Sequence, residues 1–158
     1  MFAGPVVYEG EVQPGWIDFN GHMNVAYYVL AFDLAVDALW LTFGMDERYR
    51  RETRGSTFAV ESHVRYLREL ASGDPFVITA TVVGHDAKRI HQFQRMYHAV
   101  DGYLAATCEW MNLHVDLSTR RVSPWPPEVE RAIAKFAATT AGAERPDGLG
   151  SVMGIPER

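Results

Sequence analysis

Residues 25–43, VAYYVLAFDLAVDALWLTF, decide the fold of this chain. Only Asp33, Asp37 and Thr42 interrupt the apolar run, and the two aspartates stand one helical turn apart on a thin stripe. The run is nearly long enough to cross a bilayer, but two carboxylates near its middle are costly in hydrocarbon. We therefore expect a central helix that protein covers on most sides.

Strand-like runs flank this helix on both sides. One precedes it at 5–12, and four follow it at 57–67, 76–83, 89–98 and 103–117. The turn signals between the four later runs are Gly73-Asp74-Pro75, Gly84-His85-Asp86 and Asp101-Gly102. Consecutive short turns predict an antiparallel meander.

The first of the later runs alternates between two kinds of side chain. One face is expected to carry the apolar residues Phe58, Val60, Val64 and Tyr66, and the other to carry Glu61, His63 and Arg65. We expect the apolar face to pack on the helix and the other face to meet polar groups.

The remaining segments are shorter. We expect a surface helix or turn at residues 45–53 and a last helix, which begins at prolines, at residues 124–140. The Gly- and Pro-rich stretch 141–158 is expected to be a loose tail. Residues 1–140 are therefore expected to form a single α+β domain in which an antiparallel sheet curls round one helix. The open edges of such a sheet need protection, so we expect a homodimer joined edge to edge, or a tetramer built from such dimers.

Composition limits the classes of function. The 158 residues carry a net charge of −5, which argues against a general nucleic-acid binder. A single cysteine, Cys108, excludes an intrachain disulfide and a Cys-rich zinc site, and mid-strand it is expected to be a packed residue rather than a nucleophile. His91 and His98 lack metal-like spacing, so no metal and no cofactor are predicted. With no signal-like start, we expect a cytoplasmic protein that does not bind a membrane.

Residues 16–25, WIDFNGHMNV, are the most informative stretch for chemistry. They place a carboxylate, an imidazole and two amides in the turn that enters the helix, whose first N–H groups lack intrahelical partners and can stabilise an oxyanion. Asp18 is a candidate general base or nucleophile, with Trp16 and Phe19 expected to desolvate it. His22 and Asn24 either take part in the chemistry or brace and cap the turn.

The motif Asp18-Phe19-Asn20-Gly21-His22-Met23-Asn24, followed by Tyr28, resembles the D-x-x-G-H-V-N pattern of hotdog-fold acyl-CoA thioesterases of the 4-hydroxybenzoyl-CoA thioesterase type. Tyr66-Leu67-Arg68 and Gly73-Asp74 resemble a further signature of that family. The resemblance covers residues 6–130. It implies a hotdog fold, a catalytic carboxylate at Asp18, and helix-start amides around Asn24 and Val25 that polarise the thioester carbonyl. Trp16 stands where many relatives have a second acidic residue, which implies an altered acyl pocket.

Within that family the chain is most similar to the betainyl-CoA thioesterase modules found with carnitine dehydrogenase, through WIDFNGHMNVAYY, ESHVRYLRE, HDAKRIHQF and ATCEWMNLHVD. A betainyl group carries a quaternary ammonium, which aromatic faces bind. Glu61 is a candidate counter-charge, and the candidate aromatic residues are Trp16, Phe19, Tyr27, Phe58 and Trp110. Alternatively, these aromatics fill the core and the dimer interface.

Two further groups of residues have open roles. Glu61 and His63 either line the active cleft or pair with each other. Lys88, Arg89 and His91 follow a turn and either hold the CoA phosphates or are solvated. The sequence thus predicts hydrolysis of a small acyl-CoA, with betainyl-CoA as the favoured substrate. The alternative is a module of the same fold that binds an acyl-CoA or acyl carrier without cleaving it.

Overall fold

The computed structural model describes residues 2–155. Its elements, in chain order, are β1 (Val6–Glu11), the 3-10 helix η1 (Pro14–Trp16), α1 (Val25–Thr42), α2 (Glu47–Thr53), β2 (Gly55–Tyr66), β3 (Pro75–His85), β4 (Arg89–His98), β5 (Leu104–Asp116), β6 (Arg121–Val122) and α3 (Pro127–Thr139). This is the expected α+β order of elements. Met1 and residues 156–158 of the expected tail lie outside the described residues.

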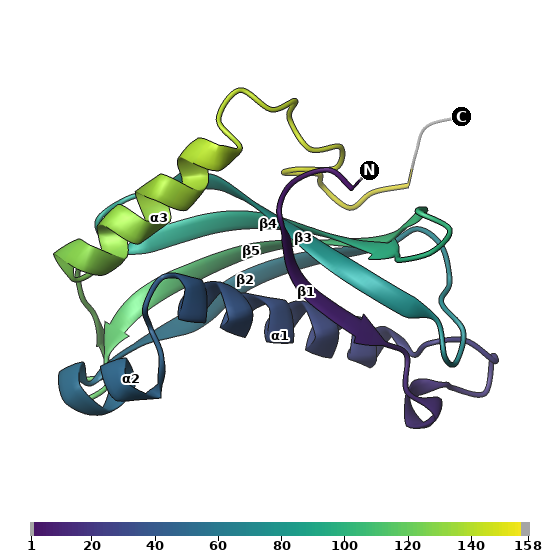
Figure 1. Ribbon diagram of the computed structural model, residues 1–158, viewed down its shortest axis with the longest axis horizontal. Helices are drawn as coiled ribbons and strands as arrows, with labels where there is room; N and C mark the ends of the chain where they lie inside the picture. Colours follow the sequence, from purple (N-terminus) through teal and green to yellow (C-terminus); the bar gives the residue numbers. More distant parts are fainter. Residues whose placement is uncertain (1, 156–158) are drawn as a thin grey trace.

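Helix α1 follows the predicted boundaries closely. Its buried residues recur every three or four positions and so form one face: Tyr28, Ala31, Phe32, Ala35, Val36, Leu39 and Trp40. By length and composition α1 could cross a membrane, but here it lies along one face of the sheet (Figure 1). In the single chain it is less covered than its sequence predicts, because Leu30 and Leu41 remain 41% and 59% exposed.

The sheet has the strand order β1-β3-β4-β5-β2, with β6 beside β5, and every pair is antiparallel. The hairpins β3-β4 and β4-β5 confirm the predicted turns at Gly84-His85-Asp86 and Asp101-Gly102. The twelve-residue strand β2 is left as an edge strand. One long hydrogen-bonding edge of the sheet is therefore unpaired in the single chain.

The expected pairing between β2 and β3 is wrong. β2 pairs with β5, and the chain crosses over between Leu67 and Asp74 before β3 begins. Gly73 and Asp74 do not close a hairpin, because they exchange backbone hydrogen bonds with Val12 just after β1 (Gly73 N to Val12 O, 2.9 Å; Val12 N to Asp74 O, 3.0 Å). Leu70, at the middle of the crossover, is fully buried and anchors this path over the core.

A β-bulge at Val60 changes which residues of β2 share a face. Ala59 pairs with Asn112, but Glu61 pairs with Met111, so Val60 is the extra residue. Phe58, opposite Leu113, therefore lies on the face of Glu61 and not, as predicted, on the face of Val64. We call the face that carries Glu61 and Glu109, turned away from α1, the outer face.

The C-terminal segment after α3 passes over the outer face (Figure 1). Leu149 is buried there, and the amide of Gly150 donates a 2.8 Å hydrogen bond to Oε2 of Glu109. Two residues before Leu149, Asp147 lies 3.9 Å from Arg65. Residues 147–150 of the expected tail are thus fastened to the sheet at defined points.

Candidate functional site

The turn before α1 folds into a compact loop. The amide of Asp18 donates to the carbonyl of His22 (3.1 Å), the amide of Gly21 donates to the carbonyl of Asp18 (3.0 Å), and Ile17 bridges to Met23. Gly21 has φ +85°, a conformation that L side chains rarely adopt, so a glycine fits here. These bonds hold Asp18 close to the beginning of the helix.

Asn24 links the Asp18 carboxylate to the helix. Its side-chain oxygen caps α1 by accepting from the amide of Ala26 (3.0 Å), and its side-chain nitrogen donates to Oδ2 of Asp18 (3.4 Å). Oδ1 of Asp18 accepts from the amide of Asn20 (2.8 Å), and the Asp18 residue is half-buried. Asn24 therefore acts as both cap and brace, and the carboxylate is oriented beside the first turn of the helix.

One amide at the helix start has no partner. The amide of Asn24 donates to the carbonyl of Trp16 (2.8 Å), and that of Tyr27 to the carbonyl of Asn24 (3.0 Å). The amide of Ala26 donates to the side chain of Asn24. The amide of Val25, the first residue of α1, donates no hydrogen bond within residues 2–155. Of the two predicted positions, Asn24 and Val25, only Val25 therefore offers a free N–H to a ligand at the positive end of the helix dipole.

A cavity of about 190 Å³ opens beside this amide. It lies between the start of α1 and the end of β2, and it is lined by His22, Met23, Val25, Tyr28, Tyr66, Leu67, Arg68 and Glu69. We call it the helix-start cavity. His22 is half-buried at its wall, with Nδ1 3.3 Å from the carbonyl oxygen of Met23.

Tyr28 ties the crossover segment to the loop. Its hydroxyl accepts from the amide of Leu70 (3.1 Å), while the carbonyl of Leu70 accepts from the amide of Met23 (2.8 Å). Burial raises the pKa of Tyr28 to about 12, so the phenol is neutral at physiological pH. The backbone of Leu70 thus links Tyr28 of α1 to Met23 of the loop, and both Tyr28 and Met23 line the helix-start cavity.

The predicted aromatic residues near Asp18 lie in different environments. Trp16 and Tyr27 stack on each other, with ring centroids 5.4 Å apart and planes at 11°. Phe19 is 98% exposed, so the prediction that it covers the Asp18 carboxylate is wrong. At the tip of a four-residue loop its side chain points into solvent.

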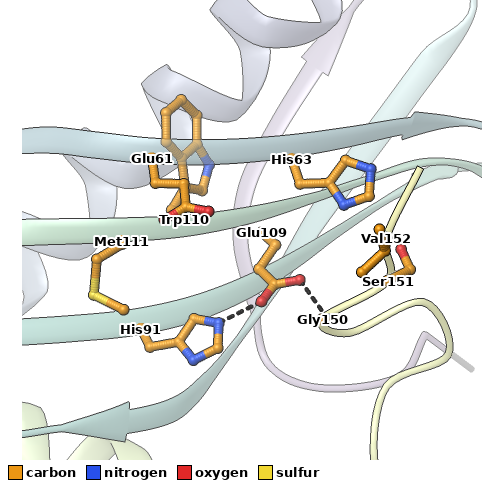
Figure 2. A pocket seen from close by; sticks show the side chains of 9 residues that line it. All are labelled: Glu61, His63, His91, Glu109, Trp110, Met111, Gly150, Ser151 and Val152. Atoms are coloured by element: carbon orange, nitrogen blue, oxygen red, sulfur yellow. Dashed lines mark hydrogen bonds and ion pairs between the residues drawn. The ribbon is translucent and has the colours of Figure 1, made fainter. Parts of the chain in front are cut away.

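Three other predicted residues, Glu61, His63 and His91, meet on the outer face. Glu61, His63, His91 and Trp110 all line a cavity of about 300 Å³ that the C-terminal segment covers, together with Glu109, Met111, Gly150, Ser151 and Val152 (Figure 2). His91 pairs with Glu109 (Nε2 to Oε1, 2.6 Å). The Trp110 side chain points to the opposite face, where it is buried in the core and its indole N–H donates to Gln94 (3.3 Å). No direct bond joins Glu61 and His63 among the described residues, so the pairing considered for them is not formed.

The remaining predicted residues lie at the opposite end of the sheet. Phe58, Leu113 and Arg89 follow one another across β2, β5 and β4. Arg89 binds Asp86 within its own turn and, as the largest cause, holds the pKa of that carboxyl at about 2. Lys88 sits in the same turn, its carbonyl accepting from the amide of His114. A single chain therefore does not bring Phe58, Lys88 and Arg89 to Asp18.

Sequence reasoning missed Tyr66, Glu69 and Tyr28 as cavity residues. Tyr66 and Tyr28 both stood in quoted motifs, but nothing in those motifs showed that their rings meet. In the structure the two rings are edge to face, with centroids 5.4 Å apart and planes at 79°. No group of three or more potential metal ligands occurs in the described part of the chain.

Comparison with known proteins identifies relatives along most of the chain. Residues 12–133 match the model of the thioesterase-like superfamily. The chain is 36% identical over 149 residues to the betainyl-CoA thioesterase of Pseudomonas aeruginosa, covering 94% of both chains. It is also 36% identical over 153 residues to the L-carnitine dehydrogenase/betainyl-CoA thioesterase of Rhizobium meliloti, but spans only 31% of that longer protein.

The fold also matches a solved structure. A protein of Staphylococcus aureus, determined in complex with CoA, superposes with a TM-score of 0.91 over 99% of both chains, at 29% sequence identity. Because the superposition covers 99% of both chains, it includes the C-terminal segment that lies on the outer face.

Proposed function

The chain belongs to the thioesterase-like superfamily, has its hotdog fold and is an acyl-CoA thioesterase, and we propose that its substrate is betainyl-CoA. The mechanism rests on one observation. The oriented Asp18 carboxylate and the free Val25 amide lie together at the beginning of α1. The fusion of similar domains to L-carnitine dehydrogenase in a relative supports a role in carnitine degradation. We place that role in the cytoplasm.

The proposed reaction uses these two groups in defined ways. The thioester carbonyl oxygen accepts from the Val25 N–H, so that negative charge developing on it is stabilised. Asp18 either removes a proton from the attacking water or attacks the carbonyl carbon itself and forms an anhydride that water then hydrolyses. In both routes the carbon–sulfur bond breaks, the thiolate of CoA takes up a proton, and the carboxylic acid is released.

The acyl group can be tested with an isosteric pair of substrates. We expect kcat/KM for betainyl-CoA to exceed that for 3,3-dimethylbutanoyl-CoA by about tenfold, because replacing the quaternary nitrogen with carbon removes cation–π attraction but keeps the shape. Thiol release is measured with a chromogenic disulfide, to which the only cysteine, the buried Cys108, contributes little background. Equal or faster hydrolysis of the neutral substrate contradicts the betainyl assignment while leaving the thioesterase activity intact.

We also propose a homodimer formed through the open edge of β2. This edge exposes apolar side chains, with Val60 and Leu67 at 56% and 42% exposure. Pairing of two β2 strands about a twofold axis satisfies the free backbone groups and buries these side chains.

Such pairing brings opposite ends of the two sheets together across the dimer. In an antiparallel pair, the first half of one strand lies opposite the end of the other. The first half of the partner's β2 is then brought alongside the end of β2 at Tyr66, while Phe58 stays on the outer face. The CoA-binding role of Lys88, Arg89 and His91 is likewise proposed across the dimer, toward the Asp18 of the second chain.

Introducing a charge on this edge tests the dimer. Val60→Glu is expected to give a monomer by light scattering after size exclusion, with kcat/KM reduced at least tenfold because each active site loses the opposite strand. Val100→Glu is the matched control, since Val100 is 77% exposed in the β4–β5 turn. A fully active monomer of Val60→Glu would contradict the shared site.

A further inference from the structure

The helix-start cavity has the size and position of an acyl pocket. Ligand pockets for drug-sized molecules are roughly 300–1,000 Å³, so its volume of about 190 Å³ suits a short acyl group better than a whole acyl-CoA. Val25, whose amide donates no hydrogen bond within residues 2–155, is one of the residues that line it. An acyl group whose carbonyl oxygen meets that amide therefore has its remaining atoms in or beside this cavity. This step rests on the proposed function.

Tyr66 presents an aromatic ring at this position. Its hydroxyl donates to the carbonyl oxygen of Val25 (3.3 Å), which fixes the ring over the first residue of α1. The edge-to-face contact with Tyr28 supports the ring from within. The Tyr66 residue is still 47% exposed, so part of its surface faces the cavity and not the core.

Two residues of opposite charge, Glu69 and Arg68, line the cavity. Glu69 is exposed on the rim and forms no ion pair with a residue between 2 and 155. Arg68 also lines the cavity, but its guanidinium carbon lies 3.7 Å from the centroid of the Tyr103 ring. Arg68 is therefore directed to a different aromatic face and forms no ion pair with Glu69 within residues 2–155, so the Glu69 carboxylate can attract a positive group.

From this arrangement we propose that Tyr66, with Glu69 as counter-charge, determines specificity for a cationic acyl group. A trimethylammonium head joined to the thioester carbonyl by one methylene lies close to that carbonyl, and so close to the ring over Val25. Cation–π attraction at a partly desolvated ring then favours it over a neutral head of the same shape. None of the aromatic residues predicted from the sequence occupies this position.

The test compares two substrates in each variant, so that losses in folding or dimerisation cancel. The measured quantity is kcat/KM for betainyl-CoA divided by kcat/KM for 3,3-dimethylbutanoyl-CoA. Tyr66→Leu is expected to lower this ratio about five- to tenfold. Tyr66→Phe keeps the ring and loses only the hydroxyl, so its ratio stays within about twofold of wild type. Glu69→Gln lowers the ratio by an intermediate factor.

Tyr97→Leu is the matched control, because Tyr97 is a half-buried tyrosine of β4 that contacts Phe2, away from the cavity. Its ratio should equal that of wild type. A wild-type ratio well above one that Tyr66→Leu leaves unchanged overturns the role of Tyr66 while the proposed substrate stands. A wild-type ratio of one or less overturns both the cation preference and this inference.

Discussion

Replacing Asp18 with asparagine is expected to lower kcat for acyl-CoA hydrolysis by about a thousandfold. Asparagine has the same shape, and its side-chain oxygen can still accept from the amide of Asn20, so the loop loses only the long 3.4 Å bond from Asn24 and should keep its conformation. The amide side chain, however, neither takes a proton from water nor attacks a thioester. General base catalysis alone contributes typically 10²–10⁴-fold, and initial rates of thiol release from betainyl-CoA measure the loss directly.

Asp101→Asn serves as the control for this substitution, because Asp101 is exposed in the turn between β4 and β5. Both variants should unfold at nearly the wild-type temperature, while only Asp18→Asn loses activity. Full activity of Asp18→Asn with every acyl-CoA would remove Asp18 from the reaction. If the wild-type protein binds intact thioester without turnover, and Asp18→Asn binds it equally well, the chain is a binding module instead.

The elements themselves were predictable because their signals are local. The apolar run of α1 predicts its helix to within one residue, and the turn signals after β3 and β4 predict two correct hairpins. The turn signal at Gly73-Asp74 misleads because a tight turn shows that the chain changes direction, not which strand it joins next. That choice is made by Leu70 and by the backbone bonds to Val12, which are contacts distant in sequence.

The bulge at Val60 shows how a single residue can invalidate a pattern. Alternation along 57–67 is regular in the sequence, so nothing there marks the point where two residues of β2 oppose one residue of β5. From the bulge toward the start of β2 every assignment to a face is reversed. Phe58 therefore moves to the outer face, although the assignments of Glu61 and His63 remain correct.

The site was predictable in its residue types and not in its hydrogen bonding. The motif identifies Asp18, Asn24 and Val25, but it does not reveal that Trp16 accepts from the Asn24 amide or that the cap occupies Ala26. Which donor remains free depends on the fold of the whole loop. The hydrogen bonds of the folded loop distinguish Val25 from its neighbours as the candidate oxyanion donor.

Removing that donor should be nearly as damaging as removing the carboxylate. Val25→Pro deletes the N–H, and we expect kcat to fall by about 10²–10³-fold, the usual loss for one oxyanion-hole donor. Val25 is the first residue of α1, where proline is tolerated because no intrahelical bond uses that amide. The preceding residue, Asn24, already has ψ 144°, the extended backbone that a following proline favours.

Val25→Ala is the matched variant, since it shortens the side chain and keeps the amide. Its kcat should stay within a few-fold of wild type, and both variants should melt close to the wild-type temperature, because Val25 is 54% exposed and contributes little to the core. If Val25→Pro and Val25→Ala are equally active, the carbonyl oxygen is bound elsewhere. A loss confined to proline assigns the stabilising hydrogen bond to one backbone N–H, which no change of side chain at this position could show.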